Sequence, residues 1–372
     1  MATQKKTAKT SGKKSGKSIT ETKKSTTSKK TKTSKKEQLK KKHKKRRILF
    51  AIEALFLIIV IPLLFFYYKI GQIPTYDMSG VVLEQNEYYD RNISEYTNIA
   101  LFGVDSRANE LTEKTRTDCI IIASINNTTK EVKLSSIYRD TFVYIKDHGY
   151  TKLNHAYAYG GPALAISTLN KNLDLSITDF ATINFSALSN VIDALGGIEI
   201  EITEDELKYV NAYAKDVAKI NGTTVEKIPS AGLQTLNGTQ ATGYCRVRYT
   251  SGGDFTRAQR QRTVIEQIVK KAKSSNPVKL YNIMNEILPQ IYTSLDTNEI
   301  LKLASGVLSY KITDNFGFPF EKETPTINGA SVVTANTLSS NVTLLHEKLF
   351  QTDNYIPSST VEYRSNEIGG FY

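Results

Sequence analysis

A chain of 372 residues is too long for one domain of ordinary size and too short for three. Its 40% hydrophobic content can build a sizeable core, and its net charge of +12 is of the size found in nucleic-acid-binding proteins. The first 47 residues, however, hold 20 Lys and Arg against two acidic residues, whereas the remainder holds 29 basic and 35 acidic residues. The remainder is thus mildly acidic, and we expect no nucleic-acid partner.

Residues 1–47 are rich in Lys, Ser, Thr and Gly and almost free of apolar side chains. Such a segment cannot bury enough surface to offset its ordering entropy, so we predict a disordered basic tail. One interpretation is a tail that binds nucleic acid or anionic lipid, but it lacks the interleaved aromatic residues of a specific reader. The favoured interpretation is a solvated positive flank, which keeps this end in the cytoplasm.

Residues 48–68, ILFAIEALFLIIVIPLLFFYY, follow the tail. This run is close to the roughly 20 apolar residues that a helix needs to cross a bilayer. Its single acid, Glu53, lies near the cytoplasmic end, and Tyr67 and Tyr68 suit the far interface. No small-residue cleavage site follows. We therefore predict an uncleaved, single-pass anchor in the cell membrane, with the catalytic domain outside.

The rest of the chain alternates strand and helix patterns after a polar linker over residues 69–96. Glu131 to Tyr138 is expected to pair as a hairpin with the strand before it. The expected strands and helices are, in chain order, strands at 98–104, 119–125 and 131–138, a helix from 160 to about 173, a strand at 177–185, a helix at 187–195, a strand at 198–202, and helices at 204–220, 236–244 and 254–273.

This order predicts a layered α/β/α domain with a mixed central sheet. We expect a catalytic domain at 97–273 and a C-terminal part at 274–351 that packs on it. Residues 352–372 are expected to form a flexible end.

Charged and amide side chains recur where these strands end and these helices begin, and ligands bind at such places in α/β sheets. Arg grips phosphate through its planar fork, and Mg²⁺ prefers one or two carboxylates with phosphate oxygens. The set therefore points to phosphoryl or pyrophosphoryl chemistry. Its members are Asp105, Arg107, Arg116, Asp118, Arg139, Asp140, Lys152, Arg246, Arg248, Asp254, Arg257 and Gln261.

Two spacings strengthen this interpretation. Arg246 and Arg248 lie two residues apart, so in extended chain both point to one face. Arg257 and Gln261 lie four apart, so on a helix they share a face near its positive N-terminus. Any one such pair can also be a surface salt bridge.

Seven segments occur in the order found in the LytR-CpsA-Psr family, which the chain resembles from about Thr97 to Lys273. Two positions differ from the family pattern: Tyr138 stands where Pro is usual, and Thr256 stands where Gly is usual. The segments are GVDSR (103–107), RTD (116–118), SSIYRDT (135–141), KLNHAYAYGG (152–161), DALGGIEIEI (193–202), GLQTLNGTQATGYCRVRY (232–249) and DFTRAQRQR (254–262).

The resemblance implies a deep apolar pocket for a polyprenyl chain. It also implies transfer of a teichoic acid or capsular-type polysaccharide from polyprenyl pyrophosphate to a peptidoglycan hydroxyl. Asp105 and Asp118 would hold Mg²⁺, or Mn²⁺ in its place. The residues expected to contact the pyrophosphate are Arg116, Arg139, Lys152, Arg246, Arg248, Arg257 and Gln261.

In the expected reaction, a sugar hydroxyl attacks the phosphorus that carries the polymer, and polyprenyl monophosphate leaves. Asp254, Asp140 or a carboxylate beside the metal could be the base. The predicted catalytic set is Asp105, Arg116, Asp118, Arg139, Asp140 and Asp254. Two alternatives stay open: a hydrolase of the same lipid pyrophosphate, and a membrane-bound regulator that acts through the basic tail.

The two cysteines, Cys119 and Cys245, show no metal-ligand spacing. A disulfide is compatible with an exported domain. We expect two buried free thiols, and we expect His155 to be structural.

Overall fold

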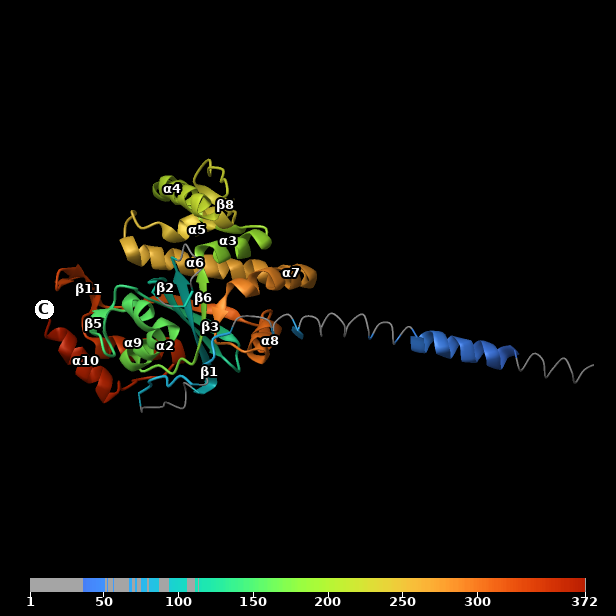
Figure 1. Cartoon of the computed structure of the whole chain (residues 1–372), viewed down its shortest axis with the longest axis horizontal. Coiled ribbons are helices and arrows are strands. Elements are labelled where there is room, and N and C mark those ends of the chain that lie inside the picture. The colour runs from blue at the N-terminus through green and yellow to red at the C-terminus, as the bar shows by residue number, and fades with distance from the viewer. Residues whose placement is uncertain are drawn as a thin grey trace, which may run out of the picture. The chain divides into compact units, whose positions relative to one another are not determined.

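The structure is a computed structural model that describes residues 36–50, 52, 56, 67–68, 71, 75–78, 80–86, 94–105, 111–112 and 114–371. The chain divides into two units, Met1–Phe65 and Phe66–Tyr372. All the strands that the structure describes lie in the second unit (Figure 1).

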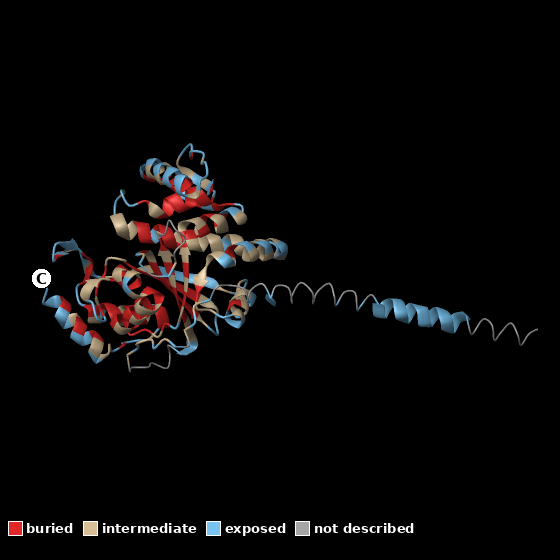
Figure 2. Ribbon diagram, in the orientation of Figure 1, coloured by how far each residue is buried: buried red, intermediate tan, exposed pale blue. Residues whose placement is uncertain are grey.

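In the first unit, residues 36–50 form a helix whose side chains are exposed (Figure 2). The prediction of disorder through Arg47 is wrong for residues 36–47, because Lys, Gln, Glu and Leu there are good helix formers. Most of the predicted membrane-spanning segment, residues 48–68, lies outside the described residues. Within the part of the chain that is described, no helix has the length and apolar character needed to cross a membrane.

The second unit is built on a six-stranded mixed sheet, in the order β10-β3-β2-β1-β6-β9. The first three strands in sequence are antiparallel neighbours, which confirms the predicted hairpin. β6 runs parallel to β1, and β10 runs parallel to β3. The strands are β1 (Tyr96–Val104), β2 (Thr117–Asn126), β3 (Glu131–Ile137), β6 (Asp179–Asn184), β9 (Tyr292–Thr293) and β10 (Lys311–Phe318).

Alternate residues of the central strands enter separate cores on the two faces of the sheet. Phe102 and Ile122 pack in one core with three helices, α2 (Asn154–Leu173), α9 (Leu338–Phe350) and α10 (Ser359–Gly369). Ile99 and Ile121 pack in the other core with α6 (Gly253–Lys273) and α8 (Thr297–Gly306). The period of two along each strand thus produces the predicted α/β/α layering (Figure 1).

A smaller subdomain lies beyond α6, built around a two-stranded antiparallel sheet and three helices with their own core. Its close packing depends on Gly243, where an added Cβ would lie 2.6 Å from the backbone nitrogen of Ala214. Its elements are α3 (Phe185–Ala194), β7 (Ile198–Ile202), α4 (Glu204–Asn221), β8 (Gly232–Leu236) and α5 (Gly238–Arg246), with α7 (Pro277–Ile287) packed against α3.

Residue 273 is not a domain boundary, because β9 and β10 follow it and complete the central sheet. The short 3₁₀ helix Leu288–Gln290 precedes β9. Two minor strand pairs follow β10: β11 (Lys322–Glu323) with β14 (Thr334–Ala335), and β12 (Thr326–Ile327) with β13 (Ala330–Ser331).

The prediction of a flexible end from residue 352 is wrong. Ser358 caps α10 by accepting a hydrogen bond from the backbone of Val361. Val361 and Ile368 are buried in the core shared with α2 and α9. One apolar side of a short helix is enough to fix this segment in place.

Candidate active site

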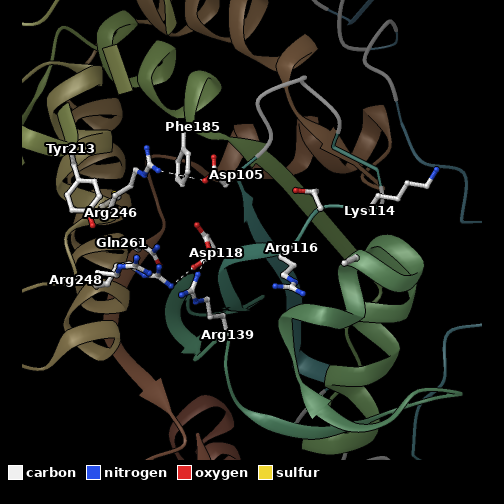
Figure 3. Close-up of a pocket in the computed structure, with 14 residues that line it drawn as sticks. Asp105, Lys114, Arg116, Asp118, Arg139, Phe185, Tyr213, Arg246, Arg248 and Gln261 are labelled. Carbon is white, nitrogen blue, oxygen red and sulfur yellow. Dashed lines mark hydrogen bonds and ion pairs between the residues drawn. The ribbon is translucent and has the colours of Figure 1, made fainter. Parts of the chain in front are cut away.

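A polar cavity of about 680 Å³ opens where β1 ends and β2 begins, below α3 and α5 (Figure 3). Most of the charged residues singled out from the sequence line it. Its lining consists of Asp105, Lys114, Thr115, Arg116, Asp118, Arg139, Ala158, Phe185, Tyr213, Cys245, Arg246, Arg248, Arg257 and Gln261.

Two carboxylates reach this cavity from neighbouring antiparallel strands. Asp105 follows β1 directly, and Asp118 is the second residue of β2. Asp105 lies 3.7 Å from the guanidinium of Arg246, and Asp118 accepts a hydrogen bond from Arg139. The predicted meeting of the two acids at one sheet edge is confirmed.

Arg139 is surrounded by carboxylates. It binds Asp118, and its Nε lies 3.7 Å from Asp140 and 3.6 Å from Asp254. Burial opposes its charge, but these three carboxylates outweigh burial and raise the pKa of Arg139. The guanidinium therefore stays charged, and it serves as an electrostatic anchor rather than a proton donor.

The first turns of α6 bring two further predicted residues to the cavity. Arg257 donates to the backbone carbonyl of Asp118 at 3.2 Å and to Asp254 at 3.1 Å, and its side chain is almost fully buried. Gln261 lies one turn further along the same face. Arg257 thus ties the helix to β2 while it presents charge to the cavity.

Arg246 is the last residue of α5 and Arg248 lies just beyond it, and both line the cavity as predicted. The extended chain that this prediction assumed is not found at Arg246, which is helical. The guanidinium of Arg246 lies 4.9 Å from the ring centre of Phe185 and 5.7 Å from that of Tyr213. Its Nη1 is buried without a hydrogen-bond partner among the described residues. Arg248 donates to the Tyr249 hydroxyl at 3.2 Å. An anion in the cavity would supply the missing partner of Arg246.

Three predicted residues lie beside the cavity rather than in its wall. Lys152 pairs with Asp140 at 3.3 Å, and Asp254 pairs with Arg257. Arg107 lies outside the described residues.

Among the lining residues that carry a charge or an aromatic ring, sequence reasoning missed three. Lys114 is two residues before the RTD segment, Phe185 follows β6 as another strand-end residue, and Tyr213 projects from the middle of α4. Lys114 and Phe185 could have been identified from their positions in the sequence, next to a motif and at the end of a strand. Tyr213 could not, because only the packing of α4 on α5 brings it there.

Arg260, below the cavity, was also missed. Its side chain is 3% exposed, and its Nε donates to Glu206 at 2.7 Å. Its other nitrogens donate to the carbonyl of Val247 at 2.9 Å and to the Thr250 hydroxyl at 2.6 Å. Val247 separates Arg246 from Arg248, so Arg260 positions the segment that carries both cavity arginines.

The carboxylates at the cavity suit a divalent metal bound largely by other oxygens. Within the described residues, no three His, Cys, Asp or Glu side chains gather as a metal cluster. Among the residues that the structure describes, the acids that line the cavity are Asp105 and Asp118. Mg²⁺ commonly takes one or two carboxylates together with phosphate and water oxygens, so these two residues fit it.

A second, apolar cavity of about 230 Å³ adjoins the first, between the sheet and helices α3 and α6. Phe185, Cys245 and Gln261 line both cavities. The apolar one also has contributions from Leu101, Phe102, Gly103, Cys119, Ala181, Ile183, Asn184, Leu188, Val191, Val264, Ile265, Ile268 and Ile291. The polar cavity therefore leads into an interior suited to a hydrocarbon chain.

Cys119 and Cys245 are free thiols; Cys245 is buried as expected, whereas Cys119 is only partly buried. Burial raises the pKa of Cys119 to about 12, and burial likewise raises the pKa of Cys245. His155 hydrogen-bonds through Nδ1 to Thr151 at 2.9 Å. Burial, followed by the positive charges of Arg116 and Lys152, lowers its pKa.

A family model described as the LytR_cpsA_psr family matches residues 69–347. The polyisoprenyl-teichoic acid–peptidoglycan teichoic acid transferase TagU of Enterococcus faecalis is 35% identical over 217 residues, which cover 57% of this chain and 66% of that protein. The chain thus matches about two thirds of the length of this relative.

Two solved structures are similar to this one. One, an Enterococcus faecalis protein described as a transcriptional regulator, is 26% identical with a TM-score of 0.58; the match covers 76% of this chain and 98% of that one. The other is the LytR-CPS2A-psr family protein YwtF (TagT) with bound octaprenyl pyrophosphate lipid. It is 22% identical with a TM-score of 0.52, covers 72% of this chain and 95% of its own, and shows the shared fold.

Proposed function

Because the chain belongs to the LytR-CpsA-Psr family, we propose that it transfers an anionic polymer from a polyprenyl pyrophosphate carrier to peptidoglycan. The polymer is a teichoic acid or a capsular-type polysaccharide, and the product link is a phosphodiester. One observation carries the proposal: an arginine-lined cavity leads directly into an apolar one. Such a pair of spaces fits a pyrophosphate attached to a hydrocarbon chain.

The polar cavity has the charge that a pyrophosphate requires. Arg116, Arg139, Arg246, Arg248 and Arg257 all line it. Converging guanidinium groups repel one another unless an anion lies between them, and their planar forks match paired phosphate oxygens. The lipid chain would extend from this point into the apolar cavity, where its burial adds to affinity.

In the proposed reaction, the oxygen of a sugar hydroxyl forms a bond to the phosphorus that carries the polymer. The bond from that phosphorus to the bridging oxygen breaks, and polyprenyl monophosphate leaves. The hydroxyl proton passes to a carboxylate. Asp105 and Asp118 line the cavity, whereas Asp140 and Asp254 are not among its lining residues, so Asp105 and Asp118 are better placed to receive it.

Asp105 and Asp118 would also hold Mg²⁺, or Mn²⁺ in its place. When bound, the metal would neutralise charge on the phosphate oxygens. The surrounding arginines orient the two phosphates, and this positioning is the protein's own share of catalysis.

We also propose that residues 48–68 anchor the chain in the cell membrane, with the basic tail in the cytoplasm and the catalytic domain outside. The apolar run and its basic flank support this orientation. Protease added to wall-stripped intact cells should then remove residues 69–372 and spare the tail. Protection of the large domain would contradict the orientation.

The test of the reaction is the pair of variants Arg246→Lys and Arg248→Lys, assayed for polymer transfer to a peptidoglycan acceptor. Lys keeps the charge but loses the bidentate contact. A charge-assisted hydrogen bond contributes about 1.5–3 kcal/mol, so each variant should lose about 10- to 150-fold in transfer. Wild-type rates in both would overturn the assignment of the phosphate site.

Arg262 on α6 provides the matched control. It is buried and donates to Asn315 at 3.1 Å, and it does not line the cavity. Arg262→Lys should lower the melting temperature but leave transfer per folded molecule unchanged. Omission of the acceptor separates the hydrolase alternative, because a hydrolase would release polymer just as fast without it.

A further inference from the structure

A second polar cleft lies between the β4–β5 hairpin (β4, Phe142–Ile145; β5, Gly149–Lys152) and α10, and it shares no lining residue with the arginine cavity. Its volume is about 450 Å³. Figure 1 shows α10 beside β5 at the edge of the second unit. The residues that line this cleft have no part in the reaction proposed above.

Tyrosine rings form much of this cleft. Tyr144 and Tyr150 are cross-strand partners with ring centres 5.4 Å apart, and Tyr363 of α10 is 64% exposed. Each ring offers an apolar face beside a hydroxyl group. A sugar ring presents the complementary combination, with C–H groups on its faces and hydroxyls at its rim.

Arg364 gives the cleft a buried positive charge. It is 8% exposed, its guanidinium lies 4.9 Å from the ring centre of Tyr144, and its Nη1 is buried without a hydrogen-bond partner among the described residues. Among those residues it also has no carboxylate within ion-pair distance. Glu367, one turn along, is exposed, and the nearby acids Glu84 and Asp174 bind other groups.

A buried guanidinium with no counter-ion destabilises the protein. Binding of a ligand with an anionic group at this place would therefore be favourable, because the ligand would supply the counter-ion. Burial lowers the pKa of Arg364, as expected for a charge that lacks a close partner. The cleft thus joins aromatic sugar-binding faces to one unpaired cation.

The same hairpin connects this cleft to the active site. Tyr150 lies two residues before Lys152 on β5, so the two side chains share a face about 7 Å apart. Lys152 pairs with Asp140 at 3.3 Å, and Asp140 lies 3.7 Å from Arg139 in the cavity wall. A polymer of sugar units can span this distance.

We propose that the cleft between β4–β5 and α10 is a saccharide subsite for an anionic sugar unit of one of the two glycans that the reaction joins. The ring packs against the tyrosines, and its carboxylate or phosphate group binds Arg364. This inference rests on the proposed function and deepens it, because it places a binding site for the polymer beyond the reacting phosphate.

The experiment is calorimetric titration of the full chain in detergent with three lipid-free probes. These are a glycan strand with carboxylate-bearing sugars, an oligomer of sugar phosphates and a neutral chitin oligosaccharide. Tyr363→Ala should weaken binding of an anionic probe about 2- to 12-fold through lost aromatic contact. Glu367→Gln should strengthen it by up to about fivefold at low salt, since it removes a repelling charge.

Glu362→Gln is the matched control, since Glu362 is exposed on the same helix but does not line the cleft. It should bind as the wild type does, and all three variants should melt normally. The anionic probe whose affinity follows the variants identifies whether acceptor or donor occupies the cleft. The proposal would be overturned if Tyr363→Ala and Glu367→Gln both bound each anionic probe with the affinity of the wild type. It would also be overturned if the wild type bound the neutral probe as tightly as the anionic ones.

Because no lipid pyrophosphate and no transfer step enters this titration, its failure would leave the proposed transferase activity standing. Absence of transfer activity would likewise leave a cleft-dependent affinity intact. The two failures are therefore distinguishable.

Discussion

Replacement of Arg260 by Ala should destabilise the protein strongly and impair transfer, although this side chain does not touch the cavity. Its three contacts join α4, through Glu206, to the segment between α5 and α6, through Val247 and Thr250. Without the guanidinium, the buried carboxylate of Glu206 loses the ion pair with Arg260, and the carbonyl of Val247 loses its hydrogen-bond donor.

The magnitude follows from burial. Arg260 is 3% and Glu206 9% exposed, and removal of one partner of a buried ion pair costs about 3–5 kcal/mol. Arg260→Lys keeps the charge but loses about two of the three hydrogen bonds, so it should cost about 1–3 kcal/mol. Lys270, also on α6, forms an exposed ion pair with Glu199 of β7 at 3.9 Å, and Lys270→Ala should cost less than about 1 kcal/mol.

The assays are denaturant unfolding and polymer transfer on each variant. At a temperature where Arg260→Lys is folded, its transfer rate should still fall, because the segment that holds both cavity arginines is less well fixed. A loss of stability below about 1 kcal/mol for Arg260→Ala would refute the argument from burial. Full transfer activity in Arg260→Lys would refute the positioning role.

Three further outcomes are expected. Asp105→Asn and Asp118→Asn should each weaken Mn²⁺ binding measured by electron paramagnetic resonance and raise the metal concentration that transfer requires; unchanged binding in both would contradict the metal assignment. Because burial lowers the pKa of His155, its neutral form stabilises the fold above about pH 6.5, and this stability is lost as pH falls through the folded-state value. His155→Gln should flatten the fall in melting temperature between about pH 7 and 5, and an unchanged slope would rule this out. With their raised pKa values, Cys119 and Cys245 should resist iodoacetamide at pH 8 in the native protein and react in guanidinium; rapid native labelling would show that the thiols are not held neutral.

The central sheet could be predicted because its strands are marked by local pattern. The apolar runs that became β1 and β2 are too long and too uniform for edge strands, and the turn after β2 fixes the hairpin. Asp105 and Asp118 could then be placed together, since each adjoins the end of a buried strand. Both inferences need only sequence-local information and the geometry of a pleated sheet.

Other elements could not be read in this way. β10 carries exposed polar residues along most of its length, and it became a strand because the free edge of β3 offered hydrogen-bond partners. The helix α10 has only three buried residues, and its packing on the core decides that it is ordered. Tertiary contacts override weak local preference in both cases.

Within the site, charge and spacing identified the arginines but not their individual surroundings. Asp140 and Asp254 share the character of Asp105, yet ion pairs hold them beside the cavity. Tyr213 and Arg260 enter the site through the packing of α4 and α6, which no motif records. A list of charged residues taken from the sequence therefore includes carboxylates that do not line the cavity, and it omits residues that position the arginines.

The parallel pairing of β10 with β3 has a consequence for how the chain matures. Lys311 pairs with Glu131, so the sheet cannot be completed until the strand 311–318 has been synthesised. Until then the outer edge of β3 has unpaired backbone groups, and pairing over such a long chain separation is slow. During its synthesis the nascent protein would thus hold an incomplete sheet, open to proteases and to foreign strands. A chaperone that covers a bare strand edge would help this protein most in that interval.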